Sequence, residues 1–114
     1  MANENNWETV DTVGLTAIVR GCFIQGGNGD LSPNERKEFS FIGKRLRGCL
    51  MNLLTARFIA GTQILLEANE QIRQANTELA AFQAHLEQTV AILTRLNGLA
   101  ALLDELLKAA VAFA

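Results

Sequence analysis

The chain is poor in proline and in side chains that carry chemistry: its 114 residues include one proline, one histidine, two cysteines and no tyrosine. A metal centre or an acid–base site needs several converging side chains, which His85 alone does not supply. Cys22 and Cys49 lie in apolar stretches without a CxxC or Cys/His spacing, as small buried residues do in a reducing compartment. We therefore expect no enzyme activity, no metal and no cofactor.

Charge of one sign is also lacking, since ten basic residues stand against twelve acidic ones. This balance gives no general attraction for nucleic acid or for an anionic membrane. Residues 1–11 lack the basic and apolar regions of a secretory signal. Charged residues interrupt the most apolar windows, so no membrane-spanning helix is expected. These features predict a cytoplasmic protein.

Apolar side chains are abundant, at 49% of the sequence, and their spacing predicts an all-α fold within a single helical domain, residues 1–114. Residues 7–24 carry apolar side chains at intervals of three and four, which predicts a first helix, followed by a glycine-rich turn over 25–32. Ser32, Pro33 and Glu35 then form the pattern of a capping box with proline at the first helical position. A second helix is expected to begin at Pro33.

No further proline and no glycine pair follow before Asn97, so the second helix is expected to run over about 33–97. At the standard rise such a helix would be roughly 97 Å long. Asn97 and Gly98 suggest its C-cap, and a short helix is expected over about 99–112. The alternative is a turn near Asn69–Asn76, which would give a compact three-helix bundle within one chain.

A heptad seam of apolar residues continues from Met51 to Ala110 and indicates a coiled coil or helical bundle. A single chain of this size cannot cover so long a helix, so the seam predicts a homo-oligomer, dimeric or higher, or a contact with another helical protein. The residues expected to form this seam are Leu65, Ile72, Leu79, Phe82, Leu86, Leu93, Leu96, Leu103 and Leu107.

Four basic residues of the second helix, Arg36, Lys37, Lys44 and Arg47, fall within about 100° of one another on a helical projection. They form a basic stripe that could face an acidic protein or, less readily, nucleic acid, because no aromatic residues are interleaved with them. A simpler explanation is a solvent-exposed face, or a face that meets an acidic helix of a neighbouring molecule.

The segment Asn28–Glu35 resembles the second half of an EF-hand calcium loop through Asn28, Gly29, Leu31, Ser32 and Glu35. Calcium needs six to eight oxygen ligands, and the first and third ligand places of such a loop would hold Ile24 and Gly26. A glycine turn followed by a capping box explains the same residues. The leading expectation is a non-enzymatic structural or protein–protein interaction protein, with a small adaptor or a calcium-responsive switch as alternatives.

Overall fold

The computed structural model describes residues 7–83 and 85–113, and this part of the chain is mostly helical. The all-α class is thereby confirmed, with three very short strands added to the helices. The elements in chain order are β1 (Trp7–Glu8), α1 (Thr12–Gly26), α2 (Pro33–Leu53), β2 (Ala56–Ile59), α3 (Gln63–Ala80), α4 (Leu86–Lys108) and β3 (Ala112–Phe113).

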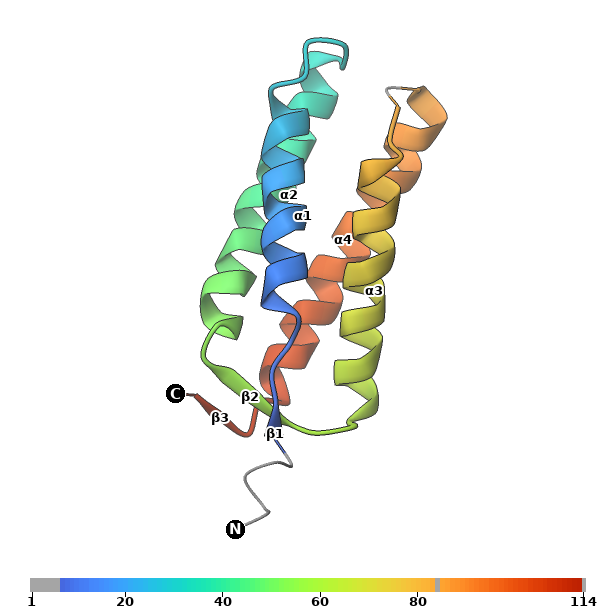
Figure 1. Cartoon of the computed structure of the whole chain (residues 1–114). Coiled ribbons are helices and arrows are strands. Elements are labelled where there is room, and N and C mark those ends of the chain that lie inside the picture. Colours follow the sequence, from blue (N-terminus) through green and yellow to red (C-terminus); the bar gives the residue numbers. More distant parts are fainter. Residues whose placement is uncertain (1–6, 84, 114) are drawn as a thin grey trace.

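The four helices form two antiparallel hairpins, α1–α2 and α3–α4, that lie side by side (Figure 1). Helix α1 packs against α2 and α3, and α4 packs against the same two helices, so the order around the bundle is α1, α2, α4, α3. Both hairpin turns lie at one end of the bundle and the strands lie at the other (Figure 1). The molecule is elongated, with extents of 54 × 20 × 19 Å.

The short strand β2 links the two hairpins and pairs with both ends of the described chain. It is antiparallel to β1, with Trp7 opposite Ile59, and to β3, with Ala56 opposite Phe113. Ala56 and Phe58 point into the bundle and are buried, whereas Arg57 and Ile59 point outward, as the twofold alternation of a strand requires. The sheet therefore closes one end of the hydrophobic core.

The core runs through all four helices, and two glycines allow helices to approach closely within it. A Cβ at Gly43 would lie 3.1 Å from Cβ of Cys22, so α1 and α2 are in contact there. A Cβ at Gly14 would lie 2.8 Å from Ile72 of α3. Large residues of the core that are almost or wholly inaccessible are Leu15, Ile18, Phe39, Ile42, Leu46, Leu53, Phe58, Leu65, Ile72, Leu96, Leu99 and Leu103.

The predicted start of the second helix is confirmed at Pro33. The Ser32 hydroxyl accepts a hydrogen bond from the Glu35 N–H at 3.2 Å, and the Glu35 carboxylate accepts one from the Ser32 N–H at 2.9 Å. These two bonds satisfy N–H groups that the first helical turn leaves without partners.

The predicted continuous helix over 33–97 is wrong. The chain leaves the helical conformation after Leu53 and again after Ala80, and the next helices begin at Gln63 and Leu86. Gly61, with φ of 77°, makes the turn from β2 into α3, in a conformation that residues with a Cβ adopt only at a cost. The alternative turn at 69–76 is also wrong, because that segment lies inside α3.

Three other predicted boundaries also change. The first helix begins at Thr12 rather than near residue 7, because the Asp11 side chain caps it by accepting from the Gly14 N–H at 2.9 Å. Asn97 and Gly98 lie within α4 and do not end a helix. The short helix predicted over 99–112 is the second half of α4, which ends at Lys108.

Candidate interaction surfaces

The residues of the predicted oligomer seam lie mainly inside the molecule. Leu65, Ile72, Leu93, Leu96 and Leu103 are buried, and Leu79, Phe82 and Leu107 are partly buried against the same core. Leu86 differs from the others, since 72% of its surface is exposed at the start of α4. The structure thus brings the seam together within one chain, and of this set Leu86 offers the largest free apolar surface.

A groove between α2 and α4, here called the α2/α4 groove, lies at the end of the bundle that carries the hairpin turns. Two adjoining hollows of about 480 Å³ and about 410 Å³ form it, and they share Glu38 and Asn97 in their linings. Three large apolar side chains on its walls are more than half exposed: Phe41 at 67%, Leu86 at 72% and Val90 at 57%. Exposed apolar residues gathered at a groove are typical of a protein-binding surface.

Charged side chains border the α2/α4 groove on the α2 side. Lys37, Glu35 and Glu38 line its two hollows, and Lys44 lies exposed further along the same helix. The Glu35 carboxylate is already held by the capping box, whereas Glu38 and Lys44 take part in none of the ion pairs among the described residues. Lys37 is likewise in none of these ion pairs, so the rim offers one negative charge, Glu38, and two positive charges, Lys37 and Lys44, to a partner.

The four residues of the predicted basic stripe divide between two sides of α2. Arg47 turns toward α1, where its guanidinium carbon lies 5.4 Å from the centre of the Phe23 ring, and Arg36 shares that side of the helix. Lys37 lines the α2/α4 groove, and Lys44 lies two turns further on the same side. Arg47 thus contacts Phe23, whereas Lys37 lines the groove, and the acidic-partner face formed by the four residues stays a prediction.

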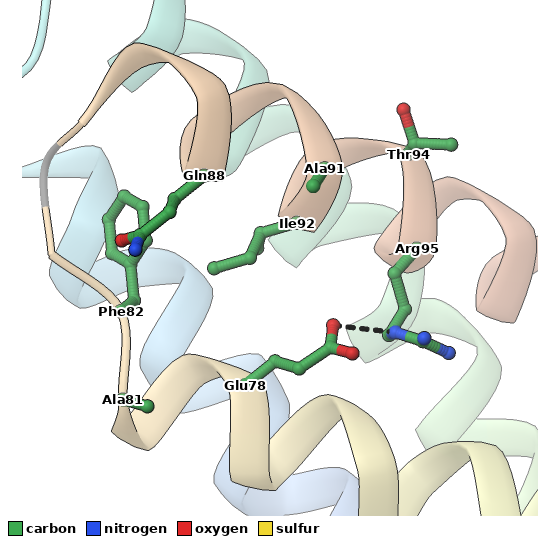
Figure 2. A pocket seen from close by; sticks show the side chains of 8 residues that line it. All are labelled: Glu78, Ala81, Phe82, Gln88, Ala91, Ile92, Thr94 and Arg95. Carbon is green, nitrogen blue, oxygen red and sulfur yellow. Dashed lines mark hydrogen bonds and ion pairs between the residues drawn. The ribbon is translucent and has the colours of Figure 1, made fainter.

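A third hollow, of about 510 Å³, lies between α3 and α4 on another side of the bundle (Figure 2). Phe82 and Ile92 supply its apolar lining, and an ion pair between Arg95 Nε and Glu78 Oε1, 2.6 Å long, lies at its edge. Since Glu78 already neutralises Arg95, the hollow presents no free charge from this pair to a ligand.

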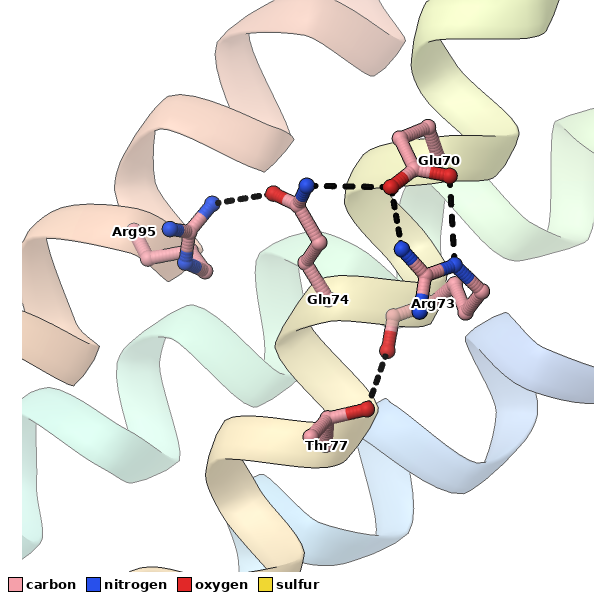
Figure 3. Close-up of polar contacts among 5 residues, drawn as sticks. All are labelled: Glu70, Arg73, Gln74, Thr77 and Arg95. Atoms are coloured by element: carbon pink, nitrogen blue, oxygen red, sulfur yellow. Dashed lines mark hydrogen bonds and ion pairs between the residues drawn. The ribbon is translucent and has the colours of Figure 1, made fainter.

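The same arginine connects to a longer line of polar groups along α3 (Figure 3). Arg95 Nη1 donates to Gln74 Oε1 at 3.2 Å, and Gln74 Nε2 donates to Glu70 Oε2 at 3.0 Å. Glu70 also accepts hydrogen bonds from Arg73 on the same helix. These bonds join α3 to α4. Sequence reasoning missed the Arg95–Glu78 pair, because only the turn after α3 brings the two residues together.

The segment that resembles a calcium loop uses its polar groups in its own turn. Asn28 Oδ1 accepts from the Asp30 N–H at 2.9 Å, Asn28 Nδ2 donates to Gln25, and the Glu35 carboxylate binds the Ser32 N–H. Leu31 is buried in the core. These bonds give Asn28, Ser32 and Glu35 structural roles in the connection from α1 to α2.

Both thiols are buried, and neither has an environment that favours the thiolate. Burial raises the pKa of Cys22 to about 12. Burial and the neighbouring Asp104 carboxylate raise the pKa of Cys49 to about 11. Cys49 Sγ donates to Asp104 Oδ1 at 3.5 Å, and Arg45 pairs with the same carboxylate at 2.9 Å and lowers its pKa. Within the described ranges, no group of three His, Cys, Asp or Glu side chains is placed to hold a metal ion.

A smaller apolar patch lies on the outer face of the sheet. Trp7 and Ile59 are about half exposed opposite one another, and the guanidinium carbon of Arg57 lies 5.7 Å from the Trp7 ring centre. Arg57 therefore covers part of the aromatic surface. None of the three hollows described above includes the residues of this patch.

Comparisons with protein-family models, with curated proteins and with solved structures give no match for this chain. Among residues 7–83 and 85–113, no helix has both the length and the apolar character needed to cross a membrane.

Proposed function

We propose that this chain is a non-enzymatic protein–protein interaction protein that associates with itself through its helices. The observation that supports the proposal is the α2/α4 groove, where Phe41, Leu86 and Val90 are all more than half exposed. Covering three such side chains would remove a large apolar area from water, at about 25 cal/mol per Å².

The remainder of the molecule supports an interaction role more than a catalytic one. The two thiols carry raised pKa values, the Glu35 and Glu78 carboxylates are engaged in hydrogen bonds or ion pairs, and the histidine, His85, is exposed at the start of α4. A catalytic site needs a nucleophile or a base held beside a partner group in a pocket. The α2/α4 groove instead offers apolar contact area with charges at its rim, which is the usual composition of a binding surface.

The test compares the solution mass of the wild type with that of Leu86→Asp by sedimentation velocity over a range of concentrations. We expect the wild type to self-associate and Leu86→Asp to remain monomeric, because the charge would have to be buried in the contact. Val13→Asp is the matched control: Val13 is 82% exposed on α1, away from the groove, so this variant should associate like the wild type.

Helical circular dichroism of both variants checks that the fold is retained, which exposed positions permit. A wild type that stays monomeric at every concentration, or a Leu86→Asp variant that associates as the wild type does, would contradict the proposal.

A further inference from the structure

On the α2 side of the groove, two residues of opposite charge lie at equal distances along the helix from one exposed aromatic residue. Phe41 is 67% exposed, Glu38 lies three residues before it and Lys44 three residues after it. All three side chains are exposed on α2, and neither charge has an ion-pair partner in the described part of the chain. Residues three apart on a helix lie on neighbouring positions of one face.

We infer that the occupant of the α2/α4 groove is a second copy of this chain, bound about a twofold axis with the two α2 helices antiparallel and crossing at Phe41. The inference rests on the proposed function, self-association, and specifies which helices of the two copies are in contact. In such a pair, a residue n places before Phe41 lies opposite the residue n places after it in the other copy. Glu38 then lies opposite Lys44 of the second copy, and the symmetry repeats the attraction.

The charges of Glu38 and Lys44 favour this orientation. Lys37 and Arg45, four residues before and after Phe41, would also lie opposite one another, but Arg45 is already paired with Asp104 at 2.9 Å. A parallel arrangement in the same register would place Glu38 against Glu38 and Lys44 against Lys44, which is repulsive. A twofold contact uses the same surface on both molecules, so a surface that carries both charges at equal distances from its centre is complementary to itself. The two Phe41 rings would meet at the axis, beside the exposed Leu86 and Val90 of each copy.

The backbone of α2 is also accessible where a second helix would approach. A Cβ added at Gly48 would find no atom within 4 Å, so one turn beyond Lys44 the helix surface is open. In the antiparallel register Gly48 lies opposite Asn34 of the second copy, since each is seven residues from Phe41. A small residue at this place lets the two helices pack closely.

The experiment uses charge reversal at the paired positions in the full chain. Glu38→Lys alone and Lys44→Glu alone each turn both attractive pairs of the homodimer into repulsive ones, and we expect each to raise the dimer dissociation constant roughly tenfold. An equimolar mixture of the two single variants should form a heterodimer about as tight as the wild-type dimer, because both facing pairs then regain opposite charges. The double variant Glu38→Lys, Lys44→Glu should also regain wild-type affinity.

Native mass spectrometry with one variant labelled by heavy nitrogen identifies the heterodimer, and sedimentation velocity gives the affinities. A mixture that associates no better than either variant alone would overturn the register, even if Leu86→Asp still dissociates the wild-type dimer as the proposed function requires. A monomeric wild type would overturn both. The three charge variants alter exposed side chains, and equal melting temperatures by circular dichroism confirm that differences in mass reflect association.

Discussion

The two cysteines illustrate how burial sets the chemistry of single residues in this bundle. Cys22 is inaccessible between α1 and α2, and Cys49 is buried beside Asp104, where α2 meets α4. Their pKa values of about 12 and about 11 lie above the ordinary 9.0, so the folded protein keeps both thiols neutral near pH 7. Since the thiolate is the nucleophile, neither residue is reactive while the bundle is intact.

These raised pKa values predict a loss of stability at alkaline pH. The unfolded chain releases the Cys22 proton near pH 9.0 and the folded chain only near pH 12, so the thiol's contribution is complete below pH 9 and declines above it. Between those limits the free energy of unfolding should fall by about 1.4 kcal/mol per pH unit for this group. Urea unfolding at pH 8, 9, 10 and 11 measures the decline. The Cys22→Ala variant should show a shallower decline, and equal slopes for the two proteins would contradict the assignment.

Alanine substitutions at two glycines should change stability in opposite directions, one through backbone strain and the other through helix propensity. Gly61 has φ of 77°, so Gly61→Ala should destabilise the fold by about 1–2 kcal/mol. Gly98 lies inside α4 with open space around its Cα, so Gly98→Ala should stabilise it by up to about 1 kcal/mol. Urea midpoints measure both changes. If Gly98 instead ended a helix with positive φ, its substitution would be destabilising, so the sign for Gly98→Ala tests the continuity of α4.

At the scale of elements, the strongest local signal predicted a helix boundary correctly, whereas the weaker Asn97–Gly98 signal did not. Ser32, Pro33 and Glu35 together specify the start of α2, because proline, the cap hydroxyl and the returning carboxylate each act within one turn. The candidate surface was partly predictable from helical periodicity. Leu86 was predicted as a residue of the oligomer seam, and Lys37 and Lys44 as part of the face for an acidic partner. All three lie in or along the α2/α4 groove.

The two missed breaks carry much weaker signals. Gly61 is an isolated glycine, and the connection from Ala81 to His85 contains neither glycine nor proline. The heptad spacing of apolar residues continues across both breaks. A helix needs the same spacing of apolar residues whether its apolar face packs within its own bundle or against another chain. Phe41 and Val90 were missed because they lie outside that seam. Their exposure depends on how α2 and α4 pack, which the spacing does not specify.

Helices α3 and α4 are joined partly by an ion pair whose contribution to the free energy of unfolding can be measured. Arg95 and Glu78 have side chains about one-third exposed and are joined at 2.6 Å, so solvent weakens the pair without removing it. A double-mutant cycle with Arg95→Met and Glu78→Gln should give a coupling free energy of about 0.5–1 kcal/mol. The Glu105–Lys108 pair, with both side chains more than 60% exposed, serves as the control and should give nearly zero. Equal coupling for the two pairs would contradict the cross-helix role of Arg95.

At the scale of the whole molecule, the sheet determines how the hairpins close. Strand β2 replaces what would otherwise be the middle of a long helix, and pairing with β1 and β3 gathers three distant parts of the chain at one end of the bundle. The side chains of the seam residues Leu65, Ile72 and Leu96 are consequently buried in the core of a single chain. At the other end the α2/α4 groove opens between the two hairpins, with Leu86 and Phe41 exposed to a partner.

The packing of both hairpins into one bundle within a single chain predicts the size of the molecule in solution. Small-angle scattering of the Leu86→Asp variant, which is expected to be monomeric, should give a radius of gyration near the 15.0 Å of the folded chain. A continuous helix of roughly 97 Å would behave as a rod with a radius of gyration of roughly 28 Å. The wild type at high concentration should have twice the mass. Because the proposed contact crosses α2 near the hairpin turns and leaves each bundle folded, its scattering should fit two compact bundles. A rod-like curve for either protein would show that the seam pairs between chains instead of closing within one.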